Sequence, residues 1–246
     1  MNGDIRTFHP NGARDGILPF SNGKKQGLHQ EYTSSGNPLV QSDFMDGELD
    51  GKKINYYYDD GYRRDVLYTK GKTEGKVLYT WLNGNTKSEV FAKDSLYEGP
   101  YHTWYADGKP ESEGSYNMGI TSGKWIEYYP NGVKKTEGEN DETGELTGKK
   151  INYYRNGNIE SEEESYTAGL LNGTYKSYYP NGKISKIITY NENEAVSIEN
   201  FDINGKSLFT ASGQNGELKF RNYYPDGILE MEGVLKNGSR EGTWNF

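Results

Sequence analysis

The sequence contains no cysteine among its 246 residues. That absence excludes disulfide bonds, zinc sites built from thiolates and a thiol nucleophile, and it leaves the redox compartment open. Long apolar runs are also missing, so we expect no transmembrane segment and no signal sequence at the start. The chain is expected to be soluble, either cytoplasmic or exported with a leader that this chain does not contain. Whether Met1 is the natural start stays open.

Clustered positive charge is scarce as well. The formal net charge is -8 at pH 7, and the isoelectric point is near 5.1. A surface that binds nucleic acid needs clustered Lys and Arg to neutralise phosphates. We therefore expect no nucleic-acid partner, whereas an acidic surface would suit a basic protein.

Aliphatic residues are too few for a conventional globular core. Hydrophobic residues make up 32% of the chain, charged residues make up 26%, and the mean hydropathy is -0.98. These values alone favour disorder. The aromatic content reverses that interpretation, because there are 22 Tyr, 8 Phe and 4 Trp, and each ring can bury on the order of 150 to 250 Å². We expect a folded chain that is built around aromatic faces.

One short motif recurs along the chain. It reads "IEYYPNG" at 126–132, "KSYYPNG" at 176–182 and "RNYYPDG" at 221–227. The glycines that close the copies follow one another at steps of 22 to 25 residues, and they are Gly12, Gly36, Gly61, Gly84, Gly108, Gly132, Gly157, Gly182, Gly205 and Gly227. A fixed interval of this size indicates stacked repeats. The sequence thus predicts a single repeat array over residues 1–246.

Each repeat has the pattern of a β-hairpin. The stretch "GKWIEYY" at 123–129 is rich in aromatic and β-branched residues, P-N-G is a turn sequence, and "VKKTEGEN" at 133–140 gives a polar second strand. The predicted fold is all-β: an elongated, solenoid-like, single-layer antiparallel sheet of about ten tandem hairpin repeats with a period of about 24 residues. Residues 186–216 form an irregular repeat, because a glycine pair found in most linkers is missing there. That stretch is expected to bend or interrupt the sheet, or to be a site in its own right.

Aromatic residues recur four and three positions before the closing glycine. Neighbouring strand residues point to opposite faces of a sheet, so the repeated doublets predict two aromatic ladders, one on each face. In the central repeats, one ladder is Trp104, Tyr128, Tyr153 and Tyr178, and the other is Tyr105, Tyr129, Tyr154 and Tyr179. Any single ring is more commonly core than contact. In a single-layer sheet, however, one ladder should stay partly exposed and bind a partner, and the sequence does not say which.

Candidate chemistry is sparse. The three histidines, His9, His29 and His102, fall in different repeats, so we expect surface positions rather than a catalytic group. A "GKT" sequence at 71–73 resembles the end of a phosphate-binding loop, but Val66 stands in the place of its first glycine. We predict no catalytic residue, no metal site and no cofactor, and therefore no enzyme.

An acidic run is the remaining candidate for binding. It consists of Glu160, Glu162, Glu163 and Glu164. Such a run can attract a cation or a basic partner, but a solvated strand face is the commoner role, because calcium needs several oxygens that converge on one point.

The succession "GKWIEYYPNGVKKTEGEN" followed by a glycine-marked linker resembles the variant class of MORN repeats, as in the bacterial YwqK-type antitoxin family. The resemblance covers the whole chain. It implies a twisted sheet of hairpins that holds other proteins, and it raises a toxin-neutralising role as an antitoxin or immunity protein. The alternative is a glycan or cell-wall binding module that stacks sugars on Tyr and Trp.

Overall fold

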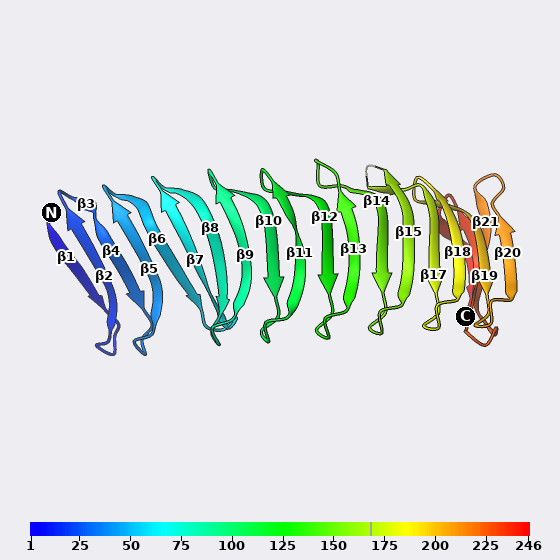
Figure 1. Cartoon of the computed structure of the whole chain (residues 1–246), viewed down its shortest axis with the longest axis horizontal. Helices are drawn as coiled ribbons and strands as arrows, with labels where there is room; N and C mark the ends of the chain where they lie inside the picture. The colour runs from blue at the N-terminus through cyan, green and yellow to red at the C-terminus, as the bar shows by residue number, and fades with distance from the viewer. Residues whose placement is uncertain (168) are drawn as a thin grey trace. The chain divides into compact units, whose positions relative to one another are not determined.

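The computed structural model describes residues 1–167 and 169–246 as antiparallel β-strands joined by turns. The chain divides into an N-terminal unit, Met1–Ile120, and a C-terminal unit, Thr121–Phe246. Within each unit, the strands follow one another as hairpins, and each strand pairs mainly with its neighbours in sequence (Figure 1). The predicted all-β fold of antiparallel hairpin repeats is confirmed.

The N-terminal unit is one sheet. Its strands are β1 (Gly3–Phe8), β2 (Arg14–Ser21), β3 (Lys24–Lys25), β4 (Gly27–Tyr32), β5 (Pro38–Met45), β6 (Glu48–Tyr57), β7 (Tyr62–Thr69), β8 (Lys72–Trp81), β9 (Thr86–Lys93), β10 (Leu96–Trp104) and β11 (Pro110–Asn117). A small core lies on one face, where Val66, Val77, Val90 and Ala92 are buried and tyrosines pack around them. Aromatic rings thus enclose a short aliphatic centre, as the composition suggests.

The C-terminal unit contains two sheets. Its strands are β12 (Ile120–Tyr128), which starts one residue before the unit, β13 (Lys134–Asn140), β14 (Leu146–Tyr153), β15 (Ile159–Thr167), β16 (Leu170–Leu171), β17 (Gly173–Tyr178), β18 (Ile184–Asn191), β19 (Glu194–Phe201), β20 (Ser207–Ser212), β21 (Glu217–Tyr223), β22 (Leu229–Lys236) and β23 (Ser239–Asn245). Strands β21 to β23 form a separate three-stranded sheet. Hydrogen-bonded strand pairing therefore changes sheets after Ser212, at the end of the irregular stretch.

The separate sheet packs on one face of the strands that precede it. Leu218 of β21 is buried together with Ile188 of β18 and Ile198 of β19, and Phe209 and Phe220 pack against this cluster. Figure 1 shows the last strands behind β17 to β19. The single layer predicted from the repeats thus becomes a double layer at this end of the C-terminal unit, because the irregular repeat supplies the aliphatic residues that a second layer must bury.

Two kinds of turn connect the strands, and each requires a glycine at a fixed position of the repeat. In the Y-Y-P-N-G turn, Gly132 donates its backbone N–H to the carbonyl of Tyr129 (2.8 Å), with φ of +85° at the glycine. In the linker turn, Asp46 and Gly47 both have positive φ between paired residues Met45 and Glu48. Two positive φ angles in succession define the tight hairpin turn that favours Asn, Asp and Gly.

Candidate functional site

The two rings of each doublet lie on opposite faces of the C-terminal unit. One face carries Tyr128, Tyr153 and Tyr178, and we call it the open face. The opposite face carries Trp125, Tyr175 and Tyr179, and we call it the groove face. Side chains along β17 alternate between the two faces. Tyr175 packs against the buried cluster on one face, and Tyr178 donates to Glu162 on the other.

The second ring of the doublet ties one repeat to the next. Its hydroxyl donates to a backbone carbonyl at the following turn, and the bonds are Tyr129 Oη to Tyr153 O (2.9 Å), Tyr154 Oη to Tyr178 O (2.6 Å) and Tyr179 Oη to Phe201 O (2.9 Å). In the N-terminal unit, Trp81 Nε1 donates in the same way to Trp104 O (3.1 Å). This ladder therefore satisfies carbonyls that the strand pairing leaves free, which is a structural role.

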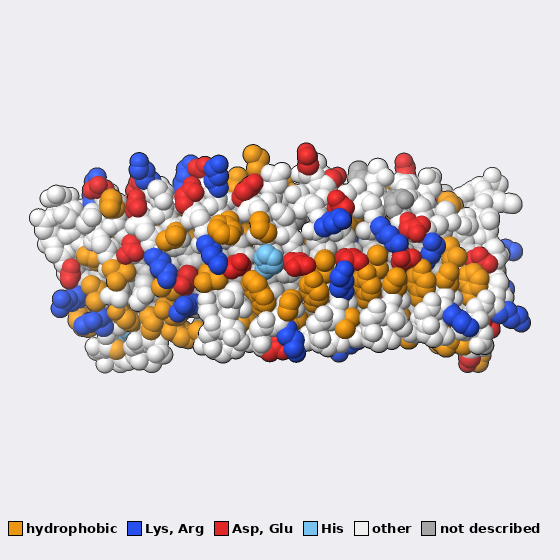
Figure 2. Space-filling model, in the orientation of Figure 1, with side chains coloured by type: hydrophobic (Ala, Val, Ile, Leu, Met, Phe, Trp, Pro, Cys, Tyr) orange, Lys and Arg blue, Asp and Glu red, His pale blue; other side chains and the backbone are white. Residues whose placement is uncertain are grey.

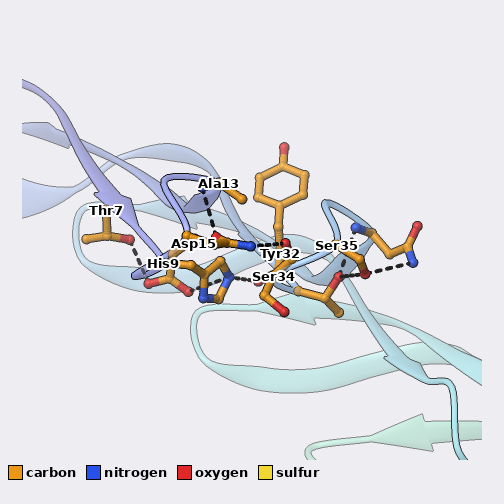
Figure 3. A network of polar contacts seen from close by, with 10 residues as sticks. Thr7, His9, Ala13, Asp15, Tyr32, Ser34 and Ser35 are labelled. Atoms are coloured by element: carbon orange, nitrogen blue, oxygen red, sulfur yellow. Dashed lines mark hydrogen bonds and ion pairs between the residues drawn. The ribbon is translucent and has the colours of Figure 1, made fainter.

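The first repeat makes the same link with a histidine (Figure 3). His9 Nε2 donates to Tyr32 O (2.9 Å), and its ring is held by Asp15 at 3.5 Å, which also accepts a bond from Thr7 (3.0 Å). The other two histidines lie elsewhere, His29 against Phe44 and His102 against Trp104. The histidines thus have separate neighbours. His9 and His102 are partly exposed, whereas His29 is buried, so the surface position expected for His29 is wrong.

The asparagine of the motif makes a second tie between repeats that sequence reasoning missed. Asn131 Oδ1 accepts from the backbone of Val133 (3.1 Å) inside its own turn, while Asn131 Nδ2 donates to the carbonyl of Arg155 (2.9 Å) in the next turn. Asn83 and Asn181 reach across in the same way, at 2.8 and 3.2 Å. The recurrence of asparagine at one motif position is a sequence signal for this tie. Which carbonyl the side chain bonds to, however, depends on how the turns stack.

The first ring of the doublet bonds backwards to an acidic residue on the open face. Tyr153 Oη donates to Glu137 (2.5 Å), and Tyr178 Oη donates to Glu162 (2.6 Å). Burial and this hydrogen bond raise the pKa of Tyr153 to about 12. Lys134 beside Glu137 lowers the pKa of that carboxyl, and the tyrosine hydroxyl adds to the effect. The ladder rings are thereby fixed in orientation.

The acidic run is divided between the two faces and is largely paired. Glu162 forms an ion pair with Lys149 (2.7 Å) and Glu164 forms one with Lys176 (3.1 Å) on the open face, whereas Glu163 faces Lys150 (3.5 Å) on the groove face. Among the described residues, only Glu160 of the run makes no ion pair, and it is exposed. The run is therefore not one continuous acidic patch.

The open face presents a band of rings. Tyr128, Tyr153 and Tyr178 are partly buried there. Figure 2 shows hydrophobic side chains in a band over β12 to β19, beside Lys and Glu side chains. A hollow of about 270 Å³ lies over β12 to β14, lined by Lys124, Trp125, Ile126, Glu137, Gly138, Glu139, Lys149 and Ile151. Most of these side chains belong to the open face.

The groove face contains two larger hollows. One has a volume of about 350 Å³ and lies between β17 to β19 and the separate sheet, with Tyr175, Tyr179 and Tyr223 in its lining. The other has a volume of about 340 Å³ and includes Tyr129. Both hollows include Tyr175, so they are contiguous.

The other predicted site residues, Trp104 and Tyr105, belong to the N-terminal unit. Trp104 accepts the bond from Trp81 and packs on His102, with 5.8 Å between ring centroids. Tyr105 closes its own turn through its backbone, at 2.9 Å from Gly108. In the described part of the chain, there is no group of three or more His, Asp or Glu that could hold a metal ion. No helix among the described residues is long and apolar enough to span a bilayer.

Part of the chain matches a known family of repeats. Four segments match the model of a family described as MORN repeat variant, and they are residues 97–118, 122–139, 146–167 and 171–192. MORN repeats are in general non-catalytic modules for binding, and the matched segments are the central repeats that carry the doublets. No curated protein matches the sequence.

Similar solved structures add little. A crystal structure of TcdB2-TccC3 is 11% identical over 96% of this chain and 15% of that chain, with a TM-score of 0.17. A crystal structure of TcdB2-TccC3-TEV is 11% identical over 98% of this chain and 18% of that chain, with a TM-score of 0.15. This chain thus spans less than a fifth of either, and scores this low carry no argument about fold or function.

Proposed function

We propose that this protein is a non-catalytic scaffold that binds another protein through the open face of the C-terminal unit. The observation that carries the proposal is that the tyrosine hydroxyls of the two ladders have different hydrogen-bond partners. The ring hydroxyls of Tyr129, Tyr154 and Tyr179 bond to backbone carbonyls of the next repeat, whereas those of Tyr153 and Tyr178 bond to side-chain carboxylates of the previous repeat and orient their rings on the open face. Oriented tyrosines lose little conformational entropy on binding and are favoured interface anchors.

The position of the separate sheet also favours the open face as the binding surface. Strands β21 to β23 cover part of the groove face through Leu218, and none of the described elements of the C-terminal unit is packed in this way on the open face. The hollow of about 270 Å³ beside the ring band is large enough to receive a partner side chain. The ion pairs around it, such as Lys149 with Glu162, are partly exposed and can exchange partners on binding.

The charge of the chain favours a basic partner. A net charge of -8 speeds the encounter with a protein of opposite charge, mainly through the association rate. A basic toxin that is sequestered by an antitoxin or immunity-type scaffold is the form of this function that we propose.

The test compares two ladder variants of the full chain. The open-face variant changes Tyr128, Tyr153 and Tyr178 to alanine. The matched control changes Tyr129, Tyr154 and Tyr179 to phenylalanine, which removes three hydrogen bonds worth about 1 kcal/mol each but keeps the rings. A partner isolated from native cells with the unmodified protein is purified and titrated against each variant by calorimetry.

The expected result is opposite behaviour of the two variants. The open-face variant should keep its β-type circular dichroism but lose partner binding by a factor of about 100 or more, as expected when several anchors are truncated. The control should unfold at a lower temperature and still bind when folded. A folded open-face variant that binds as well as the unmodified protein would overturn the proposal.

A further inference from the structure

The groove face of the C-terminal unit contains two adjacent hollows, which we treat together as one groove. Its two hollows, of about 350 and 340 Å³, share Tyr175 and Glu160 in their linings, and together they run across β14 to β19. The separate sheet supplies one wall through Tyr223 and Tyr224. The groove thus crosses consecutive repeats and has a floor and a wall.

The floor carries small polar side chains instead of rings. Ser177 and Ser185 share a hydrogen bond of 2.8 Å on paired strands, and one repeat earlier Asn152 Nδ2 donates to Ser161 Oγ at 2.9 Å. Each of these two repeats therefore places a hydrogen-bonded pair of hydroxyl or amide side chains in the floor of the groove. Ser177, Ser185 and Asn152 are partly exposed and keep unused hydrogen-bonding capacity, because a hydroxyl can donate once and accept twice and an amide has two donors, whereas Ser161 is buried.

Aromatic rings flank this polar floor at the interval of the repeat. Tyr129 and Tyr154 occupy the same position in consecutive repeats and are partly exposed, whereas Tyr179 in the next repeat is buried, with 9% of its surface exposed. Neighbouring strands lie about 4.8 Å apart, so a two-stranded repeat advances by about 9.6 Å. That distance is close to the length of two sugar rings in an extended chain.

The charges in the groove argue against an anionic ligand. Glu160 at the rim has no ion-pair partner among the described residues, and Glu230 accepts a hydrogen bond from Asn222. Lys186 also lines the groove, with its amine 5.8 Å from the centre of the Phe220 ring. Burial lowers the pKa of Lys186, although the charge of Glu230 opposes the shift. Both hollows thus combine carboxylates with a lysine, Lys186 in one and Lys135 in the other, and this mixture of charges among hydroxyls suits a ligand that is rich in hydroxyl groups and uncharged.

We propose that this groove binds an extended, neutral oligosaccharide, with sugar rings against the tyrosines and sugar hydroxyls on the Ser, Asn and Glu side chains. Binding at this groove is separate from the protein contact on the open face. The groove gives it a defined length, because about two sugar rings fit each repeat that the groove crosses.

The experiment titrates the full chain by calorimetry with cello-, chito- and malto-oligosaccharides, each as the di-, tetra- and hexasaccharide. We expect one series to bind, with affinity that rises from the disaccharide to the tetrasaccharide and then levels off where the groove ends. A Tyr224→Ala variant should weaken that binding about tenfold or more, because it removes a wall ring that is 49% exposed and therefore available for contact. Glu160→Gln should also weaken it while leaving the melting temperature unchanged.

The matched control is Tyr57→Ala, which removes a ring of the N-terminal unit that is 36% exposed. It should bind the sugars as the unmodified protein does. Absence of binding in all three series, affinity that ignores chain length, or equal losses in Tyr224→Ala and Tyr57→Ala would each overturn the proposal. Melting curves of every variant ensure that a lost titration signal is not caused by unfolding.

Discussion

The motif Y-Y-P-N-G uses tyrosine rather than phenylalanine because both phenol hydroxyls have a partner. Tyr154 Oη reaches a backbone carbonyl of the next repeat, and Tyr153 Oη reaches a carboxylate of the previous one. His9 and Trp81 occupy the second position in other repeats and also donate to the next repeat, whereas Asp202 at that position accepts from backbone N–H groups of its own turn. At the first position, Phe8 has no hydroxyl and stays exposed. The tyrosines and the asparagine of the motif therefore link neighbouring repeats as well as filling space.

The bond between Tyr153 and Glu137 predicts a loss of stability in alkali. The pKa of Tyr153 is raised from an ordinary value of about 10 in the unfolded chain to about 12 in the folded protein. A raised pKa stabilises the fold fully below the unfolded value, and that stability is lost as the pH rises from about 10 to about 12. The loss should be no more than about 1 kcal/mol, because the ring is only partly buried.

The measurement is urea unfolding between pH 9 and 12, a range chosen to bracket these two values. A Tyr153→Phe variant should be less stable than the unmodified protein at pH 9 and should lose less stability on the way to pH 12. Glu137→Gln should flatten the profile in a similar way, since it removes the charged acceptor. Parallel profiles for Tyr153→Phe and the unmodified protein would show that this bond has no effect on stability.

Paired residues of a hairpin exchange side-chain volume at one position of the repeat. In three hairpins, a glycine stands under an aromatic ring, as Gly138 does under Trp125, and an added methyl group there would lie 2.7 Å from the ring. In the hairpin of β8 and β9, the equivalent pair is Val77 and Val90, which are 0% and 4% exposed. The pair of Trp125 and Gly138, with one large side chain and none opposite it, thus takes the place of two valines of medium size.

This exchange predicts strong coupling between the two positions. Gly138→Ala should destabilise the protein by about 1 to 3 kcal/mol, because the methyl group would displace the indole ring. Combining Trp125→Val with Gly138→Val should recover most of the loss, since the Val77 and Val90 pair already packs in this geometry. Chemical denaturation of the single and double variants measures the coupling. Additive losses would mean that the two side chains do not share one space.

The hairpins and their turns could be read from the sequence because they depend on local signals. Gly132 and the residues before it specify a turn whatever lies around them, and the doublet specifies one ring on each face. The partners of Tyr154 and Asn131 could not be read in this way, because their reach depends on the stagger between stacked repeats. The groove was missed for a different reason: its wall includes Tyr223 of the separate sheet, and the period gives no sign that this sheet packs back on β18 and β19.

At the scale of the whole molecule, each unit has its own buried cluster. Val77 lies at the centre of one cluster and Ile198 lies in the other. Within each unit, the repeats are joined by strand pairing and by the side-chain bonds of the motif, which connect neighbours. Stability should then be close to a sum over repeats and their junctions.

The last prediction removes one repeat in register. Deleting residues 124–148 joins Gly123 to Lys149 and replaces one linker glycine by another, since Gly123 and Gly148 both have positive φ, +73° and +63°. We expect a shorter protein that folds cooperatively, with a lower free energy of unfolding because one repeat and one junction are lost. Deleting residues 124–136 should instead prevent cooperative folding, because it removes most of β12, the turn and the start of β13, fuses the remnants of one hairpin and shifts the aromatic pattern out of register. Circular dichroism and urea titration of both proteins decide the matter: equal damage from the two deletions would mean that the C-terminal unit is one indivisible core and not a stack of exchangeable repeats.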